Sequence, residues 1–137
     1  MRFQAIHPAE VRRWWSFVRP LIEQVFRICR EHQIPEDVYA CLIANKAVLH
    51  VLFVDEEPKG CVVTEACGDP DHRFLNVWIL HFVQNVDAHR EEIVKWLDSQ
   101  AALAQVKRIR FQSPRAWKAL IRDEFKEKSV IYERIIQ

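Results

Sequence analysis

Three apolar segments in close succession, residues 48–54, 61–66 and 74–84, constrain the fold of this chain more than any other feature. They are rich in β-branched and aromatic residues and are separated by short turns, so each is predicted to be a strand. Successive strands joined by tight turns pair antiparallel. We expect the first turn at residues 57–60, which contain proline and glycine, and the second at residues 68–71.

Helical patterns lie on both sides of these strands. Apolar residues spaced three and four positions apart predict amphipathic helices over residues 9–32 and 88–104, and a shorter helix is expected over 36–45. Pro20 lies inside the first pattern, and proline removes one helical hydrogen bond. We therefore expect that helix to kink there or to begin again.

The end of the chain continues this alternation of helices and strands. We expect a short strand over residues 107–111, a helix that begins at Ser113, and a final strand over 129–136. Each of these strands is reached across a helix, which favours parallel pairing. The sequence thus predicts an α/β (α+β) fold: a mixed sheet with an antiparallel N-terminal meander and helices on both faces, in one domain of residues 1–137.

Charge and glycine content exclude several classes of function. The formal net charge is only +1, so no field of the whole molecule attracts nucleic acid or an acidic membrane. No apolar run reaches the roughly 20 residues that span a bilayer. The only glycines are Gly60 and Gly68, so no glycine after residue 68 is available for a phosphate-binding loop. We expect no membrane partner.

The cysteines do not have the paired spacing of a zinc site. Each lies among apolar neighbours, where a free thiol behaves as a small core residue. We therefore expect no metal site and a reduced, cytoplasmic protein. The four residues are Cys29, Cys41, Cys61 and Cys67.

The order of the expected elements resembles that of the GNAT superfamily, the fold of acetyl-CoA-dependent N-acetyltransferases, over roughly residues 9–136. One local pattern supports the resemblance. The last helix of the family commonly reads N-x-x-A-x-x-L-Y-x-x-x-G-F, and residues 113–125 read SPRAWKALIRDEF. Ala116 and Phe125 match the pattern. Ser113 replaces the asparagine and keeps its capping chemistry.

The last helix and the pyrophosphate loop both depart from the family pattern. Leu120 replaces the tyrosine that protonates the departing CoA thiolate in many members, and leucine cannot donate a proton. The pyrophosphate loop R/Q-x-x-G-x-G/A aligns with residues 84–89, where Gln84 agrees but Asp87 and His89 replace small residues. Small residues matter there because phosphates must approach the backbone closely.

Asp87 adds a negative charge to that loop. We expect its carboxylate to cap the following helix and so to occupy the helix N–H groups itself. Two like charges about 4 Å apart cost about 4 kcal/mol at an effective dielectric constant near 20, before screening. Acetyl-CoA binding is therefore expected to be weak or absent. If it does occur, the resemblance places the cofactor against Val83, Gln84, Asn85, His89 and Arg90.

His81 is the candidate catalytic residue if the protein is active. The resemblance places it close to where family members expose a general base, and an imidazole can accept a proton from an amine. Strand alternation puts it on the same side as Leu75, Val77 and Ile79. A histidine inside the core is therefore the preferred interpretation.

Three functional hypotheses remain open. The preferred one is a non-catalytic structural or interaction protein on a GNAT-like scaffold, which binds a protein partner or a second copy of itself. Because the chain resembles small GNAT-like proteins of tailed phages, it would act in the host cytoplasm or in a virion. The second hypothesis is an N-acyltransferase that uses acetyl-CoA on an unknown amine.

The third hypothesis is a nucleic-acid adaptor. It rests on a basic group near the C-terminus that could contact phosphates. Acidic neighbours dilute this group, and no nucleic-acid-binding signature accompanies it, so nucleic acid is not the expected partner. The group consists of Lys107, Arg108, Arg110, Arg115, Lys118 and Arg122.

Overall fold

The computed structural model describes residues 1–29, 32–83, 86–110, 134 and 136. A five-stranded sheet forms its centre, with the strands in sequence order from one edge to the other. The first four strands pair antiparallel and the fifth is parallel to the fourth. The strands are β1 (Arg2–Ile6), β2 (Val48–Val54), β3 (Glu57–Cys67), β4 (Phe74–Phe82) and β5 (Ile109–Arg110).

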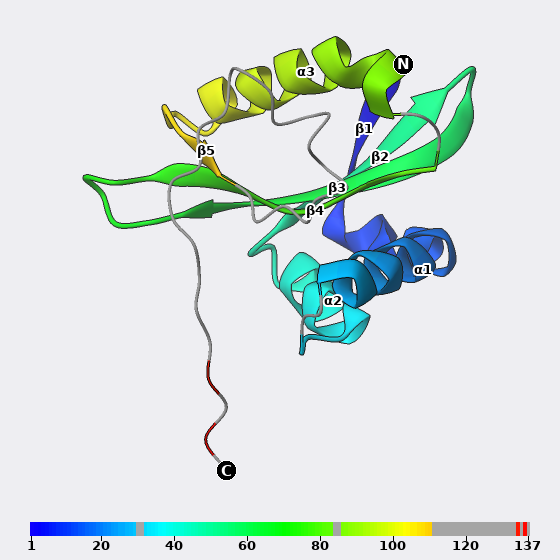
Figure 1. Cartoon of the computed structure of the whole chain (residues 1–137), viewed down its shortest axis with the longest axis horizontal. Coiled ribbons are helices and arrows are strands. Elements are labelled where there is room, and N and C mark those ends of the chain that lie inside the picture. Colours follow the sequence, from blue (N-terminus) through cyan, green and yellow to red (C-terminus); the bar gives the residue numbers. More distant parts are fainter. Residues whose placement is uncertain (30–31, 84–85, 111–133, 135, 137) are drawn as a thin grey trace.

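Helices cover both faces of the sheet (Figure 1). Helices α1 (Val11–Cys29) and α2 (Pro35–Ile43) lie on one face, and α3 (Arg90–Leu103) lies on the other. Two 3-10 turns, η1 (Pro8–Glu10) and η2 (Val86–His89), lead into α1 and α3. The predicted mixed sheet with an antiparallel meander and helices on both faces is confirmed.

Burial on both faces explains why the central strands are apolar at nearly every position. One core cluster lies between the sheet and the pair α1 and α2, and a second lies between the sheet and α3. Fully buried side chains on the α1 side include Ile22, Leu42 and Leu49, and those on the α3 side include Leu52, Ile93 and Leu97.

The sequence pattern does not predict β1. Of its five residues only Ile6 is buried, so the strand has no clear alternation of apolar and polar positions. Its backbone pairs with β2 along its whole length. Phe3 also stacks on Trp96 of α3, with parallel rings whose centroids are 4.3 Å apart. Long-range contacts, rather than local pattern, therefore hold this strand in place.

The first turn of the meander lies earlier than expected. Asp55 and Glu56 have φ angles of 52° and 63° and form the turn themselves. Pro58 and Gly60 lie within β3, where the pairing with β2 shifts in register. Proline is tolerated in a strand at such an irregularity. Gly60 is needed there because a Cβ atom would collide with the carbonyl oxygen of His81.

The other sequence predictions for local structure have mixed outcomes. The second turn is confirmed, with Gly68 at a φ of 94°. Helix α1 continues through Pro20 and does not begin again there. The helix expected from Ser113 and the strand expected over 129–136 lie outside the described residues, apart from single positions.

Candidate functional site

The candidate site lies at the end of β4 and the start of α3. Strand β5 pairs with β4 only at Leu75 and Asn76, near the beginning of β4. Among the residues that the structure describes, the remainder of β4 has no strand partner on this side (Figure 1). His81 lies in this unpaired part of the strand, and Val83 follows directly after its end.

A bulge in β4 corrects the predicted orientation of His81. Val63 of β3 pairs with Ile79, whereas the next residue, Thr64, pairs with Val77, so Trp78 is an additional residue in the strand. Val77 therefore packs towards α3, while Ile79 packs towards α1. His81 is on the α1 side with Ile79. The sequence prediction that it shares a face with Leu75 and Val77 is wrong, because the bulge reverses the alternation.

The imidazole of His81 contacts a single polar side chain among the described residues. Its Nε2 atom lies 3.0 Å from Oε1 of Gln24 on α1. Its Nδ1 atom is buried without a hydrogen-bond partner. Burial lowers the pKa of His81 below its usual value of 6.5, so the ring is neutral at pH 7. A neutral imidazole has the right protonation state for a general base. Neither nitrogen is accessible to a substrate here, because Nδ1 is buried and Nε2 contacts Gln24.

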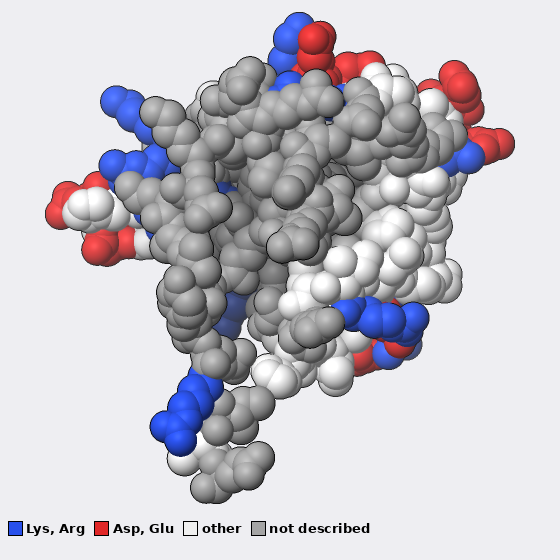
Figure 2. All heavy atoms as spheres, in the orientation of Figure 1, with Lys and Arg blue, Asp and Glu red and all other residues white. Residues whose placement is uncertain are grey.

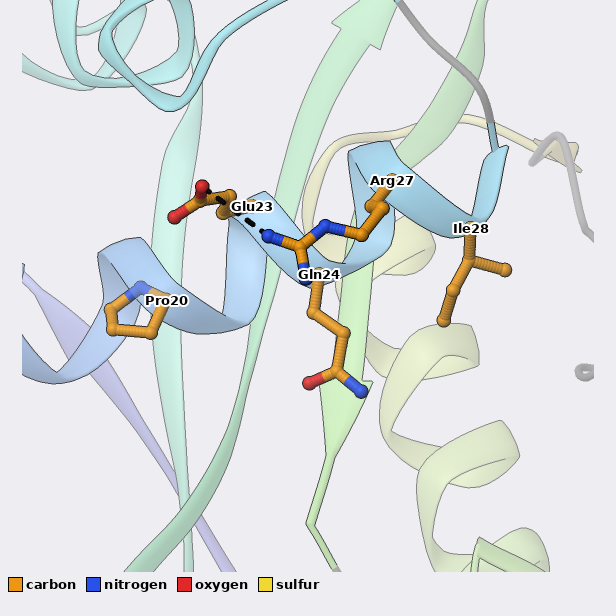
Figure 3. Close-up of a pocket in the computed structure, with 5 residues that line it drawn as sticks. All are labelled: Pro20, Glu23, Gln24, Arg27 and Ile28. Carbon is orange, nitrogen blue, oxygen red and sulfur yellow. Dashed lines mark ion pairs between the residues drawn. The ribbon is translucent and has the colours of Figure 1, made fainter.

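A shallow hollow of about 400 Å³ lies on α1 beside this contact (Figure 3). Its lining residues are Pro20, Glu23, Gln24, Arg27 and Ile28. Figure 3 shows Gln24 extending from α1 away from the ion pair between Glu23 and Arg27. The hollow and the imidazole of His81 therefore share Gln24 as a common wall.

The one carboxylate that lines the hollow is already paired. Oε2 of Glu23 lies 3.0 Å from the guanidinium of Arg19, and Oε1 lies 3.5 Å from that of Arg27. Arg19 is also paired with Glu36 at 2.8 Å, so the two guanidinium groups and two carboxylates of this cluster have no net charge. Glu23 is therefore not a free carboxylate that would attract an ammonium group. A site for a positively charged amine would need a free carboxylate, and the described lining of the hollow does not offer one.

The segment predicted to bind the cofactor is described in part. Val83 is exposed, and its N–H donates a hydrogen bond to the carbonyl oxygen of Lys59 at 2.8 Å. Gln84 and Asn85 lie outside the described residues. The backbone of residues 86–89 forms the turn η2, and Arg90 is the first residue of α3.

The helix cap differs from the prediction. Because the turn η2 precedes the α-helix, the N-cap of α3 is His89 and not Asp87, and the imidazole of His89 makes no capping hydrogen bond. The ring of His89 lies edge-on to Phe82 at 5.3 Å. Its buried Nδ1 atom is 3.8 Å from a carboxylate oxygen of Glu92, beyond hydrogen-bond distance.

These residues do not fit the pyrophosphate of acetyl-CoA. The first turn of α3, where the helix dipole would favour an anion, contains Glu91 and Glu92. The exposed carboxylate of Glu92 also lies beside the unpartnered nitrogen of His89 and competes with any phosphate for it. Glu91 and Glu92 thus place negative charge at the start of this helix.

A second buried histidine was not anticipated from the sequence. His50 lies inside the apolar run of β2, only 7% exposed, with its ring edge-on to Trp96 of α3 at 4.7 Å. Its Nδ1 atom is buried and unpartnered, and burial lowers its pKa from 6.5 to about 4. The sequence could not reveal this environment, because the contact of His50 is with Trp96 on a helix that is distant in sequence.

The cysteines are all free thiols, but they are buried to different degrees. Only Cys61 is fully buried, and burial raises its pKa to about 12, so its thiol is unreactive. The pKa of Cys67 is also raised, by burial and by the neighbouring Glu65. Within the described ranges, no three His, Cys, Asp or Glu side chains are grouped so that they could hold a metal ion.

Figure 2 shows charged side chains of both signs around the edge of the face in view. Lys107, Arg108 and Arg110 of the predicted basic group are exposed, and the guanidinium of Arg110 lies over the ring of Phe74 at 4.3 Å. The remaining members of the group lie outside the described residues. No helix among the residues that can be described is long and apolar enough to cross a membrane.

Comparison with known proteins gives matches at the level of structure. No protein-family model and no curated protein matches the sequence. An aminoglycoside acetyltransferase from an uncultured soil metagenomic sample, in complex with sisomicin, matches with a TM-score of 0.69 at 9% identity, over 99% of this chain and 96% of that one. A ribosomal-protein-alanine N-acetyltransferase from Brucella melitensis biovar Abortus 2308 matches with a TM-score of 0.67 at 14% identity, over 100% of both chains.

A third solved structure contains the cofactor. It is a predicted acetyltransferase with acetyl-CoA from Clostridium acetobutylicum, with a TM-score of 0.70 at 8% identity, over 98% of this chain and 95% of that one. At such low identities the likeness concerns the fold. The sheet order, the helices on both faces and these matches agree, and the chain has the fold of the GNAT acetyltransferases.

Proposed function

We propose that this chain is a GNAT-fold binding protein that does not use acetyl-CoA. The acidic first turn of α3 is the observation that carries the proposal. Residues 87–92 contain three carboxylates, those of Asp87, Glu91 and Glu92, and the guanidinium of Arg90, a net charge of −2 with histidine neutral. The α-amino group of Met1 lies 3.8 Å from Glu92 and offsets part of this charge. A diphosphate placed at this helix start would therefore meet repulsion where the fold normally supplies attraction.

The arrangement around His81 supports the same proposal. A general base must offer a nitrogen lone pair to the incoming amine. Nδ1 of His81 is buried, and Nε2 is engaged by Gln24. The ion-paired Glu23 gives the neighbouring hollow no affinity for a cationic acceptor. Neither the cofactor side nor the acceptor side is arranged for acetyl transfer.

A protein partner, or a second copy of the chain, is the proposed ligand. Several large apolar side chains are 42–55% exposed, which is compatible with a surface that another protein covers. They are Ile28, Ile34, Ile43, Val48 and Val83. We propose that residues 1–137 act as one domain. Action in the cytoplasm or in a virion remains a prediction that rests on the resemblance to phage proteins.

Calorimetric titration with acetyl-CoA tests the proposal. The unmodified protein should give no heat of binding up to roughly millimolar ligand, because a repulsion of about 4 kcal/mol costs about three powers of ten in affinity. The double variant Glu91→Gln/Glu92→Gln removes two charges and should bind measurably better. Glu56→Gln/Glu57→Gln, which removes two exposed charges from neighbouring positions elsewhere, is the matched control. Micromolar binding by the unmodified protein would overturn the proposal.

An N-acyltransferase is the second candidate function. It is favoured by the neutral imidazole of His81 next to the unpaired part of β4, where this side chain could take the proton of an amine if Gln24 moved aside. An acetyl-transfer assay with a panel of amines distinguishes the two candidates. Turnover that is lost in His81→Gln would establish the second, and absence of turnover with every amine agrees with the first.

A further inference from the structure

Gln24 and His81 are 57 positions apart in sequence and meet across the interface of α1 and β4. The Gln24 carboxamide has both an acceptor oxygen and N–H donors, so it can bond Nε2 of His81 whether or not that nitrogen is protonated. Nδ1 is buried without a hydrogen-bond partner. One ring nitrogen is therefore buried and the other is engaged by Gln24.

We infer that Gln24 seals His81: its carboxamide occupies the position from which an amine or any other reagent would reach the imidazole. The inference deepens the proposed function and rests on it, because it gives the physical reason why His81 is not available as a base. Gln24 is therefore a positioning residue that engages Nε2 and excludes solvent from that nitrogen.

Two glutamine side chains contact β4, and that of Gln24 is the one bonded to His81. Gln24 is exposed and lines the hollow on α1 (Figure 3). Because Gln24 also contacts His81, its removal should open the hollow towards the imidazole. Gln33 makes the comparable contact further along, where its Oε1 atom accepts a hydrogen bond from Nε1 of Trp78 at 3.4 Å. Gln33 does not contact His81. The two glutamines thus provide a variant and a matched control on the same face of the sheet.

The test is carbethoxylation, in which the lone pair of a neutral imidazole nitrogen attacks a carbonyl carbon of diethyl pyrocarbonate. The new N–C bond displaces ethyl carbonate, which takes up the ring proton and decomposes to ethanol and carbon dioxide. The rate at each histidine is followed by peptide mass spectrometry. In the unmodified protein His81 should react slowly, like the buried His50, whereas the exposed His72 reacts fast. Gln24→Ala should raise the rate at His81 roughly tenfold, about what the loss of one hydrogen bond is worth. Gln33→Ala should leave that rate unchanged.

Two results would overturn the inference: a rate at His81 of the unmodified protein equal to that at His72, or no rise in Gln24→Ala. Gln24→Glu is a second variant that keeps a hydrogen-bond acceptor, and it should keep His81 protected. An unchanged rate at His50 reports that each variant is folded. Acetyl-CoA binding by the unmodified protein would refute the proposed function without affecting this result, so the two failures can be told apart.

Discussion

Among single residues, three histidines have the most unusual surroundings. The three buried side-chain atoms without a hydrogen-bond partner in the described part are Nδ1 of His50, of His81 and of His89. The sequence singled out His81 and His89 but could not give their surroundings. The bulge that turns His81 towards α1 depends on pairing with β3. The N-cap position of His89 depends on the 3-10 turn that precedes α3. His50 was missed because its partner, Trp96, is far away in sequence.

His50 should make stability depend on pH. Burial lowers the pKa of His50 from 6.5 to about 4. At a pH between these two values His50 binds a proton in the unfolded chain but not in the native protein. This contribution is fully present above pH 6.5 and is lost as pH falls towards 4, by about 3 kcal/mol in total.

Urea unfolding at several pH values between 7 and 4 measures this effect. His50→Phe keeps an aromatic ring against Trp96 and should flatten the pH dependence by that amount relative to the unmodified protein. His72→Gln changes an exposed histidine and should not flatten it. Identical pH profiles for the unmodified protein and His50→Phe would contradict the assignment.

At the scale of elements, the sequence predicted most helices and strands to within a few residues, because their apolar periods are regular. It misplaced the first turn, since Pro58 and Gly60 resemble turn residues but lie at an irregularity of β3. It also missed β1, which is held by pairing with β2 and by the stack of Phe3 on Trp96. Contacts of this kind join distant segments and leave no local pattern.

The C-terminal end of α3 has a cap in the left-handed conformation that glycine usually occupies, but the residue there is Gln105. Gln105 has a φ of 58°, its N–H bonds to the carbonyl of Ala102, and the N–H of Val106 bonds to the carbonyl of Ala101. This is the Schellman motif, in which glycine is favoured because other residues are strained. Gln105→Gly should therefore raise the free energy of unfolding by about 1 kcal/mol. Ala102→Gly, inside the helix, should lower it by about 1 kcal/mol.

Thermal unfolding of both variants checks this prediction. Stabilisation by Gln105→Gly together with destabilisation by Ala102→Gly would support the motif. A loss of stability in Gln105→Gly would mean that the strain at this position is negligible.

The stack of Phe3 on Trp96 should couple β1 to α3. Aromatic pairs are worth about 1 kcal/mol beyond the area that they bury. A double-mutant cycle with Phe3→Leu, Trp96→Leu and the combined variant measures this coupling free energy from chemical unfolding. We expect about 1 kcal/mol. Additive effects of the two substitutions would show that β1 is held by its backbone pairing alone.

At the scale of the whole molecule, the fold was accessible from the sequence and the state of the site was not. The element order identified the mixed sheet and the two helical layers, and matches to solved acetyltransferase structures agree with it. The loss of glycine at the helix start could also be seen in the sequence. The seal by Gln24 could not, because it depends on how two layers pack across one face of the sheet.

The start of α3 should not receive a diphosphate. A titration of the 15N-labelled protein with coenzyme A measures this, because each backbone amide reports its own environment. We expect that the amides of residues 86–92 do not shift up to roughly millimolar ligand. Saturable shifts centred on these amides at micromolar ligand would contradict it.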